Sequence, residues 1–263
     1  MVQDAGRYPY CRRFLCPPVP GATVFRGATG PHSPRDLTMK RRLATLLLLA
    51  ALPFAAFAAP KAAAPAGPAP EPGVDYVEIE GGKPFAPVAG KIEVVEIFGY
   101  TCPHCAHFEP QISAWKNKLP ADVNFVPLAA PWGSYWTPYA QAFYTAQSLK
   151  LLPQTHDAVF KALHEERTLP IQNASAAQIG AFYAKYGANA QTFAATMTSP
   201  AIEQAMKRAS DFIMASGVDG TPAMVVAGKY RITTQKGFDD MLRVADHLIA
   251  QERGAKAKPK AKR

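Results

Sequence analysis

Apolar and polar positions in the centre of the chain follow a strand–helix–strand pattern. A half-buried strand is expected at 76–79, and 92–98, which is apolar enough to lie inside a sheet, predicts a second strand. A helix over 102–118 that ends before Pro120 should follow, and then a strand over 123–128. This spacing predicts two parallel strands that are joined by a right-handed helical crossover.

The next part of the chain has a helical pattern that is punctuated by proline and glycine. Five helices are expected, at 138–150, 155–167, 176–186, 190–197 and 200–216. The strand pattern returns after Gly217 as a hairpin of 223–226 and 230–232, and a closing helix is expected over 238–251.

The order of these elements predicts an α/β, thioredoxin-like fold with an inserted all-helical domain. The thioredoxin-like part comprises 74–130 and 217–252, and the helical domain comprises 131–216. Because the strand pattern returns after the helices, the helical domain is inserted into the fold rather than appended to it.

A secretory signal peptide is expected at 39–58. Met39 is followed by three basic residues, a short apolar run and a small-x-small site, which places cleavage near Ala58/Ala59. A membrane anchor is the alternative, but the apolar run is interrupted by Pro53 and only just reaches spanning length. The mature protein is therefore expected to be exported.

The segments on either side of the folded part are low in complexity or lack periodicity. Residues 1–38, with Cys11 and Cys16, lie upstream of the better start at Met39 and are expected to be disordered and absent from the mature protein. The Ala/Pro-rich segment 59–73 should be an extended linker, and 253–263 a basic, disordered tail.

The net charge of +9 belongs to the ends of the chain. Residues 1–58 have a net charge of +6 and residues 252–263 of +5, whereas the body between them has −2. A nucleic-acid surface needs basic residues clustered on the folded domain, so no nucleic acid is expected as a partner. The basic tail either binds anionic lipid headgroups or is simply solvated.

The two cysteines that remain after cleavage, Cys102 and Cys105, are expected to be a redox pair. In an exported protein they close too small a loop to stabilise the fold much, so their role is chemical. At the start of the expected helix Cys102 takes the N-cap, Pro103 the first helical position, His104 the second and Cys105 the third. Unpaired N–H groups, the helix dipole and a protonated His104 stabilise the Cys102 thiolate, whereas Cys105 stays more buried and less acidic.

The active-site segment resembles that of a known family. Residues 96–109, Glu-Ile-Phe-Gly-Tyr-Thr-Cys-Pro-His-Cys-Ala-His-Phe-Glu, are similar to the corresponding segment of the DsbA family of bacterial periplasmic thiol oxidases, and the resemblance covers roughly 74–252. It implies a periplasmic enzyme that donates the Cys102–Cys105 disulfide to reduced or unfolded exported proteins. It also implies reoxidation by a quinone-linked membrane protein. No cofactor or metal is expected, and the chain should be a monomer.

Glu96 matches a buried acid of this family, six residues before Cys102. The resemblance implies that it relays a proton to Cys105. The alternative is a strand glutamate that faces outward, as Glu93 is expected to do. A lysine that often accompanies the family's acid has no counterpart in 129–133, which reads Ala-Ala-Pro-Trp-Gly.

Four further residues are candidates for substrate binding. Pro222 matches a cis proline of the family that faces the disulfide, and the backbone at Thr221 could pair with an extended substrate. An ordinary trans proline at a strand start is the alternative. Trp132 and Trp136 either offer apolar surface to unfolded substrates or pack between the two domains.

Three other functions compete with the oxidase. A zinc site would use Cys102, Cys105, His104 and His107, but structural zinc needs ligands from two chain segments, and no second ligand pair follows. The same fold could act as a disulfide reductase or isomerase, although the Pro-His dipeptide favours oxidation. A holdase that binds unfolded chains, with incidental cysteines, is the third.

Overall fold

The structure is a computed structural model that describes residues 67–257. The expected signal peptide at 39–58, the upstream segment 1–38, the first part of the linker and residues 258–263 lie outside the described residues. No helix between residues 67 and 257 combines the length and the apolar character that crossing a membrane requires.

A mixed five-stranded sheet forms the centre of the fold, in the order β1-β5-β4-β2-β3. β2 and β3 are parallel, as the crossover spacing predicts, and the other neighbouring pairs are antiparallel. The bounds confirm the expected strands to within a residue: β1 Tyr76–Glu78, β2 Ile92–Phe98, β3 Val123–Ala129, β4 Ala223–Val226 and β5 Tyr230–Ile232.

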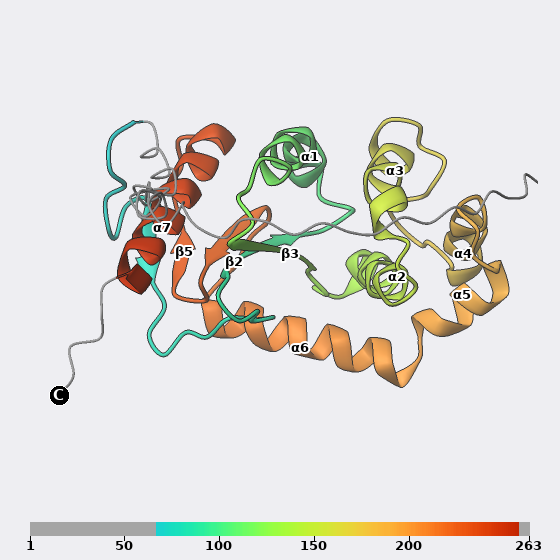
Figure 1. Cartoon of the computed structure of the whole chain (residues 1–263). Helices are drawn as coiled ribbons and strands as arrows, with labels where there is room; N and C mark the ends of the chain where they lie inside the picture. The colour runs from blue at the N-terminus through green and yellow to red at the C-terminus, as the bar shows by residue number, and fades with distance from the viewer. Residues whose placement is uncertain (1–66, 258–263) are drawn as a thin grey trace, which may run out of the picture. The chain divides into compact units, whose positions relative to one another are not determined.

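Helices cover both faces of the sheet. α1 and α7 pack on one face, and α6 runs along the other (Figure 1). The chain leaves β3 for the helical domain and returns to β4 through α6. The bounds are α1 Pro103–Lys116, the 3-10 turn η1 Ser134–Trp136, α2 Thr137–Ser148, α3 Leu152–His164, α4 Ala176–Ala184, α5 Ala190–Met197, α6 Pro200–Ser216 and α7 Phe238–Ala257.

Local sequence signals explain where several helices begin and end. Ser175 and Gln178 form a capping box at the start of α4, and the Asn189 side chain caps α5. Gly217 ends α6 in the left-handed conformation with φ 65°, which a residue without a side chain adopts at little cost. The two caps fix where α4 and α5 begin, and Gly217 turns the chain from α6 back to the sheet.

The central strand β2 is buried along its whole length, between two hydrophobic clusters. Val94 belongs to the cluster that includes Phe108 and Ile112 of α1 together with the apolar side of α7. Val95 and Ile97 point to the opposite face and join the core that continues into the helical domain. Burial on both faces explains why this strand is apolar at five of its seven positions.

Glu93 is buried, so the prediction that its side chain faces outward is wrong. Only 3% of its surface is accessible, and its carboxylate accepts hydrogen bonds from the backbone N–H groups of Phe85 at 2.7 Å and Ala86 at 2.6 Å. The loop before β2 folds over this end of the strand and supplies those donors. The sequence pattern of β2 gives no sign of this loop, since its contacts are made by backbone atoms.

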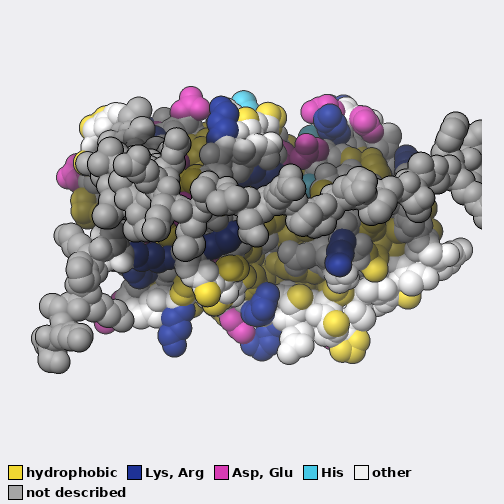
Figure 2. Space-filling model, in the orientation of Figure 1, with side chains coloured by type: hydrophobic (Ala, Val, Ile, Leu, Met, Phe, Trp, Pro, Cys, Tyr) yellow, Lys and Arg dark blue, Asp and Glu magenta, His cyan; other side chains and the backbone are white. Residues whose placement is uncertain are grey.

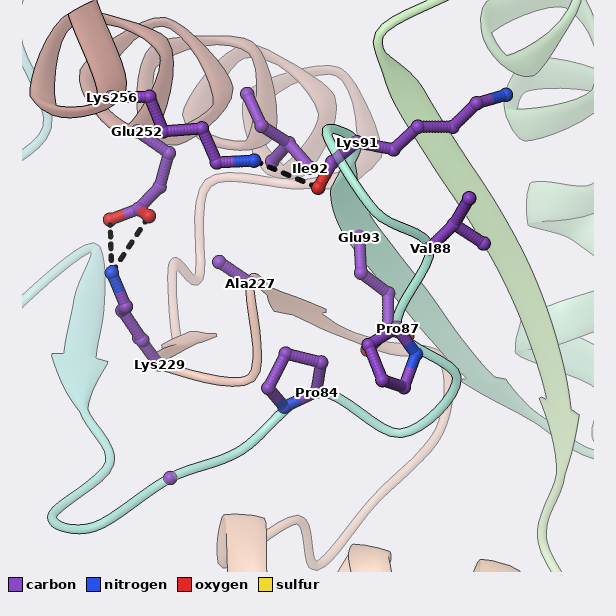
Figure 3. Close-up of a pocket in the computed structure, with 11 residues that line it drawn as sticks. Pro84, Pro87, Val88, Lys91, Ile92, Glu93, Ala227, Lys229, Glu252 and Lys256 are labelled. Atoms are coloured by element: carbon purple, nitrogen blue, oxygen red, sulfur yellow. Dashed lines mark hydrogen bonds and ion pairs between the residues drawn. The ribbon is translucent and has the colours of Figure 1, made fainter.

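The prediction of a disordered tail from residue 253 is wrong for its first residues, because α7 continues to Ala257. Arg253 forms a two-pronged ion pair with Asp122, at 2.6 and 2.9 Å. The Lys256 ammonium donates to the Lys91 carbonyl at 2.8 Å (Figure 3). These contacts extend the helix beyond the point where its apolar pattern ends.

Lys229 also pairs with Glu252 of α7 beside a pocket of about 210 Å³ at the start of β2 (Figure 3). This pocket lies at the end of β2 opposite to Cys102.

The described structure also begins earlier than the expected Val74. The Arg243 side chain of α7 donates a hydrogen bond to the Pro68 carbonyl, so the end of the predicted linker contacts the folded part. Asp75 is buried and accepts hydrogen bonds from Lys236 at 2.8 Å and from the Glu71 N–H at 3.0 Å. The prediction of an extended linker up to residue 73 is therefore wrong for its last residues.

Basic side chains are spread over the visible surface rather than gathered on it. On the face in Figure 2, Lys and Arg side chains are interspersed with acidic and apolar ones. This agrees with the net charge of −2 for the body of the chain.

Candidate active site

Cys102 lies at the junction between β2 and α1, where the sequence places it. It is the N-cap residue of α1, with extended backbone angles of φ −83° and ψ 119°, and Pro103 is the first helical residue. Its N–H donates to the Gly99 carbonyl at 3.0 Å, which closes the turn that follows β2. Cys102 is 6% exposed and Cys105 1%, so the second thiol lies behind the first.

The environment of Cys102 favours its thiolate. Hydrogen bonds lower its pKa from 9.0 to about 5: the Cys105 thiol contributes most, and Thr221 and the backbone N–H groups of Cys105 and His104 add to it against the opposing effect of burial. The pKa of Cys105 moves well above its usual range, because that thiol is desolvated and lies beside a thiolate. His104 contributes through its backbone N–H, while its side chain is exposed.

The chain returns to this site at the start of β4. The Thr221–Pro222 peptide bond is cis, as the resemblance implies. The Thr221 carbonyl accepts a hydrogen bond from the Cys102 thiol at 3.6 Å, across 119 residues of sequence. Two distant segments thus meet at the sulfur, and the pairing of β4 with β2 brings them together.

Glu96 is buried, and the outward-facing alternative is wrong. The alternation along β2 places it on the same face as Val94, towards α1, which carries Cys105. Desolvation raises its pKa to about 8, with a further increase from the charge of Glu109 and a decrease from Lys116. Within residues 67–257 its carboxyl group has no hydrogen-bonding or ion-pair partner. Glu96 therefore carries a proton at neutral pH.

Glu109, which the sequence analysis did not single out, is a second buried acid near this site. Ser113 donates to it at 2.5 Å, the Lys116 ammonium lies at 3.5 Å, and His156 of α3 lies at 3.3 Å. Burial alone would raise its pKa, but these partners hold it below the usual range. The spacing of Glu109, Ser113 and Lys116 on one face of α1 could have revealed part of this cluster, whereas His156 comes from the other domain.

The aromatic residues after β3 pack beside the active-site turn. The rings of Trp132 and Trp136 lie 5.3 Å apart, and Trp132 is 37% exposed. A Cβ atom at Gly99 would overlap the Trp136 ring, so this ring lies directly on the backbone three residues before Cys102. The structure therefore combines both alternatives: Trp136 is packed, and Trp132 is open to solvent.

The described residues give no support to a metal site. Across 67–257, no three His, Cys, Asp or Glu side chains converge in a way that could hold an ion. The His107 ring packs edge-on against Phe238, 6.0 Å between centroids. The ligand set considered for zinc is thus not brought together.

Comparison with known proteins agrees with this geometry. Residues 134–248 match the family model of the DSBA-like thioredoxin domain. The thiol:disulfide interchange protein DsbA of Pseudomonas aeruginosa is 43% identical over 188 residues, which cover 71% of this chain and 87% of that protein. The chain belongs to the DsbA family.

Other DsbA proteins give the same result. The DsbA of Azotobacter vinelandii is 39% identical over 185 residues, covering 70% of this chain and 85% of that protein. The crystal structure of the oxidoreductase DsbA from Xylella fastidiosa has a TM-score of 0.67 at 44% identity and covers 68% of this chain and 96% of that chain. The chain therefore has the DsbA-like thioredoxin fold and is a thiol:disulfide oxidoreductase.

Proposed function

We propose that the enzyme works as a dithiol oxidase, which donates the Cys102–Cys105 disulfide to reduced, newly exported proteins. The observation that supports this direction is the contrast between the two thiols: Cys102 is stabilised as a thiolate at the N-terminus of α1, and Cys105 is buried behind it. Stabilising the thiolate favours the reduced enzyme, and so makes the disulfide form a strong oxidant.

The reaction begins when a substrate thiolate attacks the Cys102 sulfur. A substrate–Cys102 disulfide forms, the bond between Cys102 and Cys105 breaks, and its electron pair passes to the Cys105 sulfur. A second substrate thiolate then attacks the substrate sulfur of the mixed disulfide. Cys102 leaves as a thiolate, which its low pKa makes easy. The substrate gains a disulfide, and the enzyme is left reduced.

Glu96 is proposed to supply the proton that Cys105 takes up when it leaves. The pKa of Cys105 lies far above neutral, so its thiolate needs a proton at once. Glu96 holds a proton at neutral pH and lies on the face of β2 that α1 covers. Since the family's lysine is missing, Glu96 is the acid of this step without a paired lysine.

Substrate chains are proposed to bind at the surface around Cys102. The backbone at Thr221 and Pro222 lies beside the sulfur and can pair with an extended peptide. Trp132 adds exposed apolar area next to the active-site turn, and its ring packs against that of Trp136, which contacts Gly99. Both features suit unfolded chains, which offer free backbone groups and apolar side chains.

The proposed setting is the periplasm, after removal of the signal peptide at 39–58. The protein acts there as a monomer on reduced or unfolded exported proteins. Because each turnover leaves Cys102 and Cys105 reduced, an electron acceptor must restore the disulfide, and a quinone-linked membrane protein is the proposed one. No nucleic acid takes part.

The test is the redox equilibrium of the cysteine pair with glutathione, followed by transfer to a reduced, unfolded protein that has two cysteines. If the enzyme is an oxidase, its cysteine pair should be mostly reduced at equilibrium with glutathione, and each enzyme molecule should transfer one disulfide to the substrate. A reduction potential near that of thioredoxin would instead indicate that the enzyme is a reductase. Alkylation of Cys102 distinguishes an oxidase from a holdase: an oxidase loses all activity, whereas a holdase still suppresses aggregation.

A further inference from the structure

Two histidines of the helical domain contact the residues that flank Cys102. His156 Nδ1 lies 2.9 Å from the Tyr100 hydroxyl, and its Nε2 lies 3.3 Å from a Glu109 carboxylate oxygen. His164 Nε2 lies 2.7 Å from the Tyr100 carbonyl. Tyr100 precedes Cys102 by two residues, and Glu109 follows it on α1. The helix α3 therefore holds the chain on both sides of the reactive sulfur.

The groups in this cluster are buried. Tyr100 is 1% exposed and Glu109 5%, and 11% of the His156 side chain is accessible. The His156 ring also packs against Phe98 and Phe160, with centroid distances of 5.0 and 5.4 Å. In such surroundings a polar group that loses its partner is costly, so each hydrogen bond strongly constrains its neighbours.

The chemistry of the three groups sets the direction of their hydrogen bonds. The Glu109 carboxylate can only accept, so His156 Nε2 carries a proton and donates it. Burial raises the pKa of Tyr100 well above its usual range, so its hydroxyl stays protonated and donates to His156 Nδ1. The charged groups that act on this cluster are Glu109 and Lys116 of α1 and Asp157 of α3.

An apolar contact could hold α3 against α1 at lower cost than this polar cluster. Buried polar groups contribute little net stability compared with apolar groups of the same volume, but they fix geometry. The hydroxyl and the carbonyl of Tyr100 are each held by a separate histidine, which fixes this residue more closely than packing alone would.

We propose that His156 is a positioning residue for thiol–disulfide exchange: it bridges Glu109 of α1 to Tyr100 of the active-site turn and holds the Cys102 sulfur against its stabilising donors. Those donors are the Cys105 thiol, the backbone N–H groups of Cys105 and His104 at the start of α1, and the Thr221 side chain. A small rotation of the turn from Gly99 to Cys102 would change their distances to the sulfur, and hydrogen bonds weaken steeply with misalignment.

The proposal rests on the exchange chemistry of Cys102 and not on its direction. The pKa of Cys102 can be measured whether the enzyme oxidises or reduces its substrates. A wild-type potential near that of thioredoxin would overturn the oxidase assignment alone. Failure of the variants below would overturn the role of His156 alone.

The experiment compares Tyr100→Phe, His156→Gln and the double variant with the wild type. Tyr100→Phe removes one oxygen atom and keeps the ring, so it should fold even if the histidine variant does not. His247→Gln is the matched control, because His247 lies on α7 and its Nε2 has no hydrogen-bonding partner among residues 67–257. The readouts are the thiolate absorbance near 240 nm against pH and the equilibrium constant with glutathione.

Both single variants should raise the pKa of Cys102 by about half a pH unit or more, and shift the glutathione equilibrium about threefold or more towards the disulfide form. The double variant should shift it no further than the larger single effect, because both changes break the same hydrogen bond. The control should match the wild type. If Tyr100→Phe lowers stability but leaves the pKa and the equilibrium constant unchanged, the cluster is structural and the proposal is wrong.

Discussion

Reduction of the disulfide should make the stability of this protein depend steeply on pH. In the folded, reduced protein the pKa of Cys102 is about 5, against an ordinary value of 9.0. A depressed pKa contributes stability that is fully present above the unfolded value and is lost as pH falls through the folded value. The oxidised protein has no thiol at this position, so it lacks this contribution.

The size of the effect follows from the two pKa values. Between pH 5 and pH 8 the reduced protein should gain about 1.4 kcal/mol of stability per pH unit relative to the oxidised protein. At pH 7 the gain over the acid limit is about 2.7 kcal/mol, which corresponds to roughly 60 mV in the potential of the pair. An acidic first cysteine is known from DsbA proteins, and the prediction for this chain is the slope of its stability with pH and the pH range over which that slope holds.

The assay is urea unfolding of the oxidised and the reduced protein at several pH values from 4 to 7.5. The quantity to follow is the difference between their free energies of unfolding, because the loop entropy of the disulfide does not vary with pH. A reduced Cys102→Ala variant, which keeps Cys105, is the control and should lose the slope. A difference that changes by less than about 1 kcal/mol between pH 4 and pH 7 would refute the reasoning.

Three further predictions follow from single contacts. Cys105→Ala removes the main donor to the Cys102 thiolate and should raise the pKa of Cys102 from about 5 to between about 6 and 7; an unchanged 240 nm titration would contradict it. Gly99→Ala should cost about 1–3 kcal/mol in urea unfolding by displacing the overlying indole, whereas Gly254→Ala, in open space on α7, should add up to about 1 kcal/mol. Equal effects would refute the close approach. Because burial raises the pKa of Glu96 to about 8, the stability that its protonated carboxyl gives the fold is fully present near pH 4 and is lost as the pH rises to about 8. Glu96→Gln avoids this loss, so it should stabilise the oxidised protein by up to about 3 kcal/mol at pH 7 and not at pH 4. A gain of the same size at both pH values would contradict this.

Local signals made most of the fold predictable. The apolar character of β2, the crossover spacing to β3 and the glycine that ends α6 each act over a few residues. The N-cap position of Cys102 follows from the proline after it, and that position accounts for much of the site. These features are properties of short segments, so they can be read from the chain alone.

Contacts between distant residues account for what the sequence did not predict. α7 is longer than its apolar pattern because Arg253 pairs with Asp122, 131 residues away. Glu93 is buried because a neighbouring loop supplies backbone donors that no side-chain pattern encodes. His156 reaches Glu109 only after the helical domain has packed on α1. In each case the partner is defined by the tertiary structure.

The hydrogen bond between Cys102 and Thr221 has a consequence for the order in which the molecule matures. It spans 119 residues, and the whole helical domain lies between its two ends. A ribosome releases Cys102 long before Thr221, and contacts of such high sequence separation form late. Until Thr221 is in place, Cys102 has only the local donors at the start of α1. The Thr221 contact is added only when β4 pairs with β2, so the surroundings of Cys102 are complete only in the finished fold.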